Sequence, residues 1–156
     1  MEVATRSLEM RPANEGAGRI LVVDDEPRVR RLVSRALGSE GIETDQASEG
    51  QEGLRKALSA SYDVVILDLQ LPRLDGLTVL RRLLSAKPGQ VVVVSSCQSD
   101  PATRSECVRA GARAFLAKPF SLVDLLTSVA VSARGSRVAP PRSAGSAASD
   151  RPAGRA

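Results

Sequence analysis

The chain of 156 residues has the size of one ordinary domain, long enough to bury a core without disulfides or a structural metal. Its 42% hydrophobic and 26% charged residues are typical of a globular protein, and no apolar run approaches the roughly 20 residues of a membrane span. The sequence contains no histidine, which excludes histidine-based nucleophilic triads, histidine general bases and imidazole metal ligands. Aromatic residues make up only 2%, so a base-stacking platform for nucleic acid is not expected.

The two ends of the chain differ from its middle. Residues 1–17 contain three acidic residues and no apolar stretch of the signal-peptide type, and the two cysteines are too few for a disulfide framework. These features predict a cytoplasmic protein with a flexible extension over residues 1–17. Residues 136–156 are rich in Ala, Ser, Pro and Gly with scattered arginines, which predicts a disordered, solvated tail rather than a nucleic-acid contact.

Between these ends, short β-branched runs alternate with amphipathic helical patterns. The predicted strands cover residues 19–23, 42–47, 63–67, 91–95 and 113–117, and the predicted helices cover 27–37, 50–60, 76–86, 101–110 and 122–133. The continuous runs VVIL and VVVV indicate strands buried on both faces. Ser121 and Asp124 have the spacing of a capping box before the last helix. The pattern predicts one α/β domain over residues 18–135, a doubly wound five-stranded parallel sheet with helices on both faces.

Charged residues gather where these strands end. Asp24 and Asp25 follow the first strand, Asp68 follows the third and Lys118 follows the fifth. Such sheets bind ligands outside the carboxyl ends of their strands. Three converging carboxylates repel one another unless a cation neutralises them, and their oxygens suit Mg²⁺. A hydroxyl and an ammonium beside them would suit a phosphoryl group. The neighbouring Glu26 is expected only to cap the following helix.

The segments ILVVDDEP, DVVILDLQLPRLDG, VVVVSS and AFLAKPF, in this order and spacing, resemble the receiver domain of two-component response regulators. The resemblance covers about residues 19–133. It implies a flavodoxin-like sheet of order 2-1-3-4-5 and an aspartate that accepts a phosphoryl group from a sensor histidine kinase or a phosphotransfer protein. A chain without histidine is the acceptor rather than the donor. The implied chemistry is self-catalysed phosphotransfer and autodephosphorylation, so we do not expect an enzyme in the ordinary sense.

By this resemblance Asp68 is the phosphoacceptor. Asp24 and Asp25 match the acidic pair that holds Mg²⁺ or Mn²⁺ together with Asp68, and the backbone carbonyl of Gln70 matches a further metal ligand. Gln70 and Gln98 flank the phosphoryl site by family position, and we expect them to tune dephosphorylation.

Three further residues match positions that respond to the phosphoryl group. Ser96 matches the hydroxyl at the end of the fourth strand, although a slip of one residue would exchange it with Ser95. Lys118 matches the lysine that pairs with the phosphoryl group, and Pro119 matches its neighbour, often joined by a cis peptide bond. Phe115 matches an aromatic switch position, with an ordinary core phenylalanine as the alternative.

The implied output is a protein contact by the face formed by residues 101–110, 113–117 and 122–133. Arg113-Ala114 stands where the winged-helix transcription-factor branch usually has two acids, so we expect a monomer or a weak phosphorylation-dependent dimer. Cys97 stands where alanine is common and is expected to be a small buried hydrophobe rather than a redox group. In the loop from Leu71-Pro72 to Asp75-Gly76, the glycine is expected to provide unusual dihedral angles.

Alternative functions remain at this point. A phosphatase resembling the haloacid dehalogenases would need a second acid two residues after Asp68, where Gln70 stands. A phosphorylation-independent binding receiver would keep the fold without using the site. The chain could also be the receiver part of a truncated DNA-binding transcriptional regulator, although nothing in it predicts sequence-specific DNA binding or a membrane contact.

Overall fold

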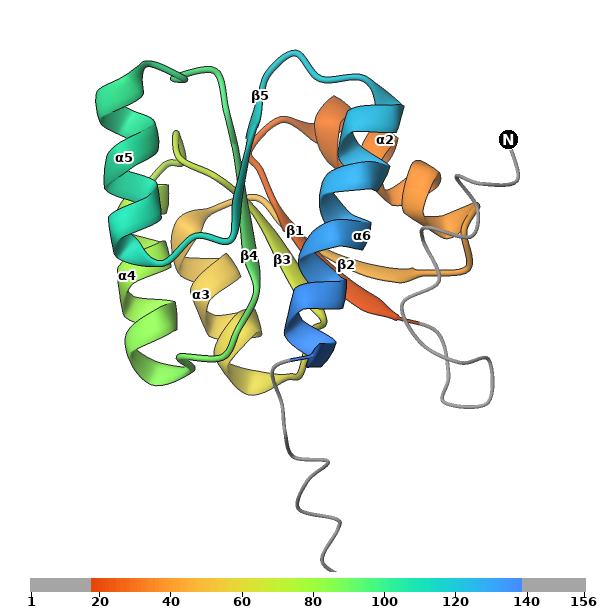
Figure 1. Cartoon of the computed structure of the whole chain (residues 1–156), viewed down its shortest axis with the longest axis horizontal. Coiled ribbons are helices and arrows are strands. Elements are labelled where there is room, and N and C mark those ends of the chain that lie inside the picture. Colours follow the sequence, from red (N-terminus) through yellow and green to blue (C-terminus); the bar gives the residue numbers. More distant parts are fainter. Residues whose placement is uncertain (1–17, 139–156) are drawn as a thin grey trace, which may run out of the picture.

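The structure is a computed structural model that describes residues 18–138, so the predicted extension, residues 1–17, and residues 139–156 of the predicted tail lie outside the described residues. Helix labels begin at α2, as in Figure 1. In chain order the elements are β1 (Arg19–Val23), α2 (Pro27–Gly38), β2 (Glu43–Ala47), α3 (Gly50–Ser59), β3 (Val64–Asp68), α4 (Gly76–Ala86), β4 (Val92–Ser96), α5 (Pro101–Ala110), β5 (Ala114–Ala117) and α6 (Leu122–Val138).

Within these residues the strands form one five-stranded sheet of order β2-β1-β3-β4-β5. Every pair of neighbouring strands is parallel. Helices α2 and α6 cover one face of the sheet, and α3, α4 and α5 cover the other (Figure 1). The predicted doubly wound α/β fold and its strand order are therefore confirmed. None of the helices in this part of the chain combines the length and the apolar character that a bilayer span requires.

The sheet separates two apolar cores because successive side chains of a strand point to opposite faces. Ile20 and Val22 of β1 pack into the core beneath α2 and α6, whereas Leu21 and Val23 pack into the core beneath α3, α4 and α5. All residues of β3 and β4 are buried, as their continuous apolar runs predict. The edge strand β2 is mostly polar and only partly buried. The centre of the sheet is therefore the rigid part that carries Asp68.

The observed elements begin and end within one residue of the predicted ones, except at the last helix. Helix α6 ends at Val138, five residues beyond the expected Ala133, so residues 136–138 lie in this helix and not in a tail. The apolar periodicity on which the prediction rests ends near Ala133. Extending an existing helix costs far less than starting one, so its backbone continues without that periodicity.

Several turns show why the helices begin where they do. Asp75 caps α4 by accepting the Thr78 N–H at 2.9 Å. The predicted capping box is present, with the Asp124 N–H donating to Ser121 Oγ at 3.0 Å and the Ser121 N–H to Asp124 Oδ2 at 3.3 Å. Glu26 occupies the N-cap position of α2, but its side chain makes no capping hydrogen bond, so that part of the prediction is wrong.

The loop between β3 and α4 contains one left-handed residue, which is Arg73 with φ 71°, and not the expected Gly76. Glycine is required at Gly76 for space, because a Cβ there would collide with the backbone carbonyl of Asp68. The Gly76 N–H donates to the Leu69 carbonyl at 2.9 Å. The start of α4 thus lies directly against the backbone of the candidate phosphoacceptor.

Candidate functional site

The carboxyl ends of β1 and β3 bring three acidic side chains together. Val23 and Leu67 are partners in the sheet, so Asp24 and Asp68, which follow them, lie side by side. Carboxylate oxygens of Asp24, Asp25 and Asp68 all lie within 4.8 Å of one another. Asp24 and Asp68 are 2% and 4% exposed, whereas Asp25 is exposed. The predicted acidic cluster is therefore present in the fold.

Lys118 places its ammonium inside this cluster. Its Nζ donates to Asp24 Oδ2 at 2.8 Å and to Asp68 Oδ2 at 3.3 Å. The lysine directly follows β5, its backbone N–H donates to the Ser96 carbonyl at 2.9 Å, and its peptide bond to Pro119 is cis. One ammonium thus pairs with two of the three carboxylates at the carboxyl edge of the sheet.

Burial and charge act against each other on these groups. Burial raises the pKa of Asp68 above its ordinary value, as does the charge of Asp24, although the Gln70 N–H and the Lys118 ammonium oppose the shift. Burial pulls the pKa of Lys118 down, but the hydrogen bonds and charges of Asp24 and Asp68 outweigh it and raise the pKa overall. Lys118 therefore stays protonated, and the cluster carries excess negative charge. Hard carboxylate oxygens with an excess of negative charge fit a small divalent cation such as Mg²⁺.

The two serines at the end of β4 occupy different environments. Ser96 is the last residue of the strand and is fully buried, and its Oγ accepts the Gln98 N–H at 3.0 Å. Ser95 is the sheet partner of Asp68, and its buried Oγ has no hydrogen-bond partner in the described part of the chain. Ser96 pairs with Ala117 of β5, directly before Lys118, whereas Ser95 pairs with Leu116.

Phe115 lies half-buried on β5 against the core beneath α3, α4 and α5. The guanidinium of Arg104, on α5, lies 4.7 Å from the centre of the Phe115 ring. Arg104 Nε also donates to the Ser99 carbonyl at 3.1 Å, which ties the aromatic ring to the loop after β4. Sequence reasoning missed Arg104, because a contact between a helix and a strand leaves no spacing signal in the chain.

The remaining predicted residues lie in the loops that follow β3 and β4. Gln70 is exposed and its backbone N–H donates to Asp68 Oδ1 at 3.2 Å, and Gln98 is exposed as well. Cys97 is exposed and not buried as expected. It is the first residue after β4, where the chain has already left the sheet, so the alanine-like size of the side chain did not indicate burial.

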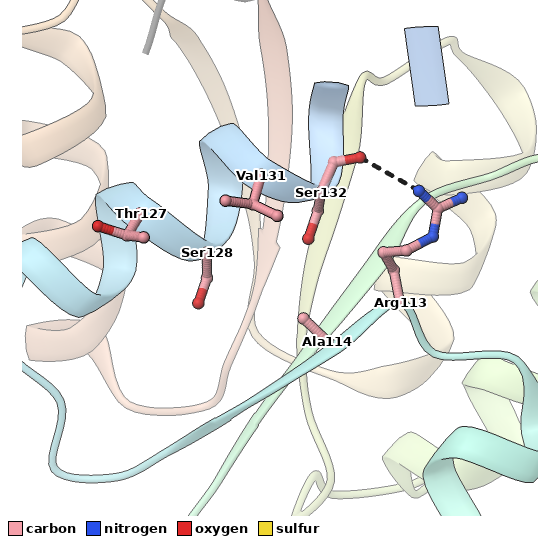
Figure 2. Close-up of a pocket in the computed structure, with 6 residues that line it drawn as sticks. All are labelled: Arg113, Ala114, Thr127, Ser128, Val131 and Ser132. Carbon is pink, nitrogen blue, oxygen red and sulfur yellow. Dashed lines mark hydrogen bonds between the residues drawn. The ribbon is translucent and has the colours of Figure 1, made fainter. Parts of the chain in front are cut away.

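A hollow of about 450 Å³ lies elsewhere, between β5 and α6 (Figure 2). Its lining residues are Arg113, Ala114, Thr127, Ser128, Val131 and Ser132. Arg113 donates to the Ser132 carbonyl at 3.3 Å across it. The hollow borders the start of β5, whereas Lys118 follows the end of that strand, so it is separate from the acidic cluster.

The family model of the response regulator receiver domain matches residues 20–130. The chain belongs to this family. The receiver domain is 36% identical over 111 residues to the transcriptional regulatory protein ResD of Bacillus subtilis, a match that covers 71% of this chain and 46% of ResD. The chain spans about half or less of the length of the curated relatives that it matches.

Solved receiver domains share the fold of this one. A CheY-like response regulator receiver domain protein from Methanospirillum hungatei is 25% identical with a TM-score of 0.76, and the match covers 79% of this chain and 98% of that chain. The receiver domain of the sensor histidine kinase PA1611 from Pseudomonas aeruginosa is 25% identical with a TM-score of 0.70, over 76% of this chain and 99% of that chain. That structure has a magnesium ion coordinated in its active-site cleft. These matches place this receiver domain in two-component signalling.

Proposed function

We propose that this receiver domain accepts a phosphoryl group on Asp68. The observation that carries the proposal is the position of the Lys118 ammonium, 3.3 Å from Asp68 and 2.8 Å from Asp24, within a cluster of three carboxylates. An Asp68 oxygen forms a bond to phosphorus while the N–P bond of a phosphohistidine breaks, and the departing imidazole takes up a proton from solvent. A sensor histidine kinase or a phosphotransfer protein would supply the group.

The acidic residues are suited to hold the divalent cation that this transfer needs. Asp24, Asp25 and Asp68 offer carboxylate oxygens, and the backbone carbonyl of Gln70 is the fourth proposed ligand for Mg²⁺ or Mn²⁺. When bound, such a cation neutralises charge on the phosphoryl oxygens. Lys118 pairs with those oxygens from the other side, since its ammonium already lies between two carboxylates.

The phosphoryl group would then act on the end of β4. Ser96 donates its hydroxyl to a phosphoryl oxygen, which draws the loop after β4 toward Asp68. Arg104 joins that loop to Phe115, so the ring can turn only if this contact breaks. The proposed output is a changed protein-binding face formed by α5, β5 and α6. Gln70 and Gln98, exposed beside the site, would tune how fast water removes the group.

A receiver that works without phosphorylation would not need Lys118 between Asp24 and Asp68, so we rank that function second. A receiver that belongs to a DNA-binding regulator is favoured by one observation, the match to ResD, a transcriptional regulatory protein longer than this chain. We expect no sequence-specific complex with DNA from residues 1–156 in a mobility-shift assay at about 150 mM salt. A competitor-resistant complex would favour the DNA-binding regulator.

The phosphoacceptor is tested by incubating the protein with acetyl phosphate and Mg²⁺ and measuring its intact mass. The wild type should gain one phosphoryl group, and EDTA should prevent the gain. Asp68→Asn should gain none, and Asp25→Ala should lose most of the labelling because the other acids hold a hard cation poorly. Asp45→Asn, in the middle of the edge strand β2 and outside the acidic cluster, is the matched control and should be labelled normally. Equal labelling of Asp68→Asn would overturn the assignment.

The switch is tested with beryllofluoride, a mimic of the phosphoryl group. Amide chemical shifts on α5, β5 and α6 should change when beryllofluoride and Mg²⁺ are added to the wild type, and not in Asp68→Asn. A face that stays unchanged in a wild type whose Asp68 region responds would refute the proposed coupling.

A further inference from the structure

Arg30, near the start of α2, contacts the backbone of the turn that carries Asp24 and Asp25. Its guanidinium NH1 donates to the carbonyl oxygen of Asp24 at 2.7 Å. Its Nε donates to Gln46 Oε1 at 3.2 Å. The first bond is charge-assisted and short, which makes it one of the stronger hydrogen bonds available to a backbone carbonyl. Arg30 thus links α2, β2 and the turn after β1.

The other end of this link is itself anchored. Gln46 lies on β2, where its side-chain amide donates to Ser34 Oγ at 3.0 Å. Its backbone carbonyl accepts the Lys56 ammonium at 2.6 Å. Because Gln46 is held by Ser34 of α2 and by Lys56 of α3, the acceptor that faces the Arg30 guanidinium has a defined position. Arg30 therefore fixes the turn after β1 relative to α2 and β2.

The bond to the Asp24 carbonyl fixes the peptide plane between Asp24 and Asp25. The Asp24 N–H is held as well, by the Ala47 carbonyl at 3.1 Å, and Asp24 Oδ1 accepts the Glu26 N–H at 2.9 Å. The Asp25 side chain is exposed and has no hydrogen-bond partner in the described part of the chain. Its direction therefore depends on the backbone that Arg30 holds.

We infer that Arg30 is a positioning residue of the divalent-cation site, orienting Asp24 and Asp25 through their shared peptide group. This inference rests on the proposed function, because it concerns the cation that the acidic cluster would hold. Arg30 itself contacts neither the cation nor the phosphoryl group. Its role is to keep two carboxylates aimed at the same point before the cation arrives, which lowers the reorganisation that binding requires.

Whether removal of Arg30 weakens or strengthens Mg²⁺ binding distinguishes a positioning role from a purely electrostatic effect. Arg30 is a positive charge near an acidic site, so by Coulomb's law its removal should strengthen the binding of Mg²⁺. If Arg30 positions the ligands, its removal should weaken that binding instead. Partners that orient metal ligands commonly contribute 10- to 100-fold to metal affinity, so we expect Arg30→Gln to weaken Mg²⁺ binding about 10-fold.

The experiment titrates MgCl₂ into the unphosphorylated full chain and follows amide chemical shifts, with urea unfolding in EDTA measured on the same variants. Arg30→Lys keeps the charge and one donor and should recover part of the affinity. Gln46→Ala removes the anchor but keeps the arginine, and should weaken binding to a smaller extent. Arg31→Gln removes a neighbouring exposed charge of α2 and should leave the affinity equal or slightly higher.

The outcomes separate the inference from the proposed function. Weaker binding by Arg30→Gln in a variant that still unfolds cooperatively supports the positioning role. Unchanged or tighter binding by Arg30→Gln, with normal binding by the wild type, overturns the positioning role alone. A wild type that shows no response to MgCl₂ overturns the cation site and the inference with it. If Arg30→Gln fails to fold, Gln46→Ala decides, because unchanged affinity there would overturn the inference.

Discussion

Two charged clusters at opposite ends of the sheet use similar residues to different effect. Near the amino ends, the Asp45 carboxylate accepts the Tyr62 hydroxyl at 2.6 Å and the Arg19 guanidinium at 2.9 Å. At the carboxyl ends, the Lys118 ammonium pairs with Asp24 and Asp68, and the exposed Asp25 is the third carboxylate of the cluster. The first cluster balances one acid with one cation and a hydroxyl, whereas the second leaves negative charge in excess.

The pKa values of Asp45 and Asp68 shift in opposite directions in the two clusters. The hydrogen bond from Tyr62 and the charge of Arg19 lower the pKa of Asp45, which means that the folded protein favours its carboxylate form. Burial raises the pKa of Asp68, so the folded protein disfavours its charged form. A cation that binds beside Asp68 would stabilise its charged form and so offset the effect of burial. The opposite shifts fit an amino-end cluster that stabilises the fold and a carboxyl-end cluster with the proposed role in phosphotransfer.

The largest effect is expected when the ammonium of the carboxyl-end cluster is removed. In Lys118→Met, the buried Asp24 and Asp68 lose their shared cation, so the free energy of unfolding in EDTA should fall by about 3 kcal/mol. Mg²⁺ should stabilise this variant more than it stabilises the wild type. Urea unfolding with EDTA and with Mg²⁺ measures both effects. Arg109→Met, which removes an exposed cation from α5, is the control, and an unchanged stability of Lys118→Met would contradict the account.

A smaller loss is expected at the amino-end cluster. Tyr62→Phe keeps the ring but removes the hydrogen bond to the Asp45 carboxylate, so the free energy of unfolding at pH 7 should fall by about 1.5 kcal/mol. Phosphorylation should be unaffected, since Tyr62 lies at the other end of the sheet. A loss of labelling by acetyl phosphate in this variant would show that the two ends of the sheet are coupled.

The same tyrosine predicts a dependence on alkaline pH. Burial, together with the hydrogen bond and charge of Asp45, raises the pKa of Tyr62 from 10.0 to about 12. The folded protein therefore holds the phenol proton more tightly than the unfolded chain, so this stabilisation is complete below pH 10 and is lost as the pH rises toward 12. Tyr62 is the only tyrosine, so its ultraviolet absorbance reports its titration without overlap. A midpoint near 10 in the folded protein would contradict the prediction.

The smallest effect has the opposite sign. Asp68→Asn removes one carboxylate from the crowded cluster, so in EDTA it should raise the free energy of unfolding by up to about 1 kcal/mol, although it abolishes phosphorylation. Urea unfolding at pH 7 measures the change. Asp45→Asn is the matched control and should be destabilising, because that carboxylate has its full set of partners. Destabilisation of both variants would remove the distinction between the two clusters.

The fold and the acidic cluster were predictable because each rests on a local signal. The buried runs of β3 and β4 need only apolar, β-branched residues in sequence, and parallel strands bring the residues after them to one edge. The convergence of Asp24, Asp68 and Lys118 follows from that rule alone.

The contacts of Arg30 and Arg104 were not predictable in the same way. Each arginine joins elements whose relative position depends on how the helices pack on the sheet. In the sequence alone, arginines at helical spacing indicate only a solvent-exposed helix face. Gly76 was expected to supply a left-handed residue, but its constraint is the space beside the Asp68 carbonyl, which only the folded loop reveals. The exposure of Cys97 likewise depends on where β4 ends.

The position of Lys118 in the chain also has a consequence for synthesis. It is 94 residues away from Asp24 and 50 away from Asp68, which places it among the most distant contacts of the domain. Ribosomes release the amino-terminal strands first, so a nascent chain holds the carboxylates long before the lysine that neutralises them. Docking of β5 therefore completes both the sheet and the charge pairing in one late step. A receiver chain that ends before residue 118 has no ammonium beside Asp68, so the charge pairing at this edge forms only when β5 joins the sheet.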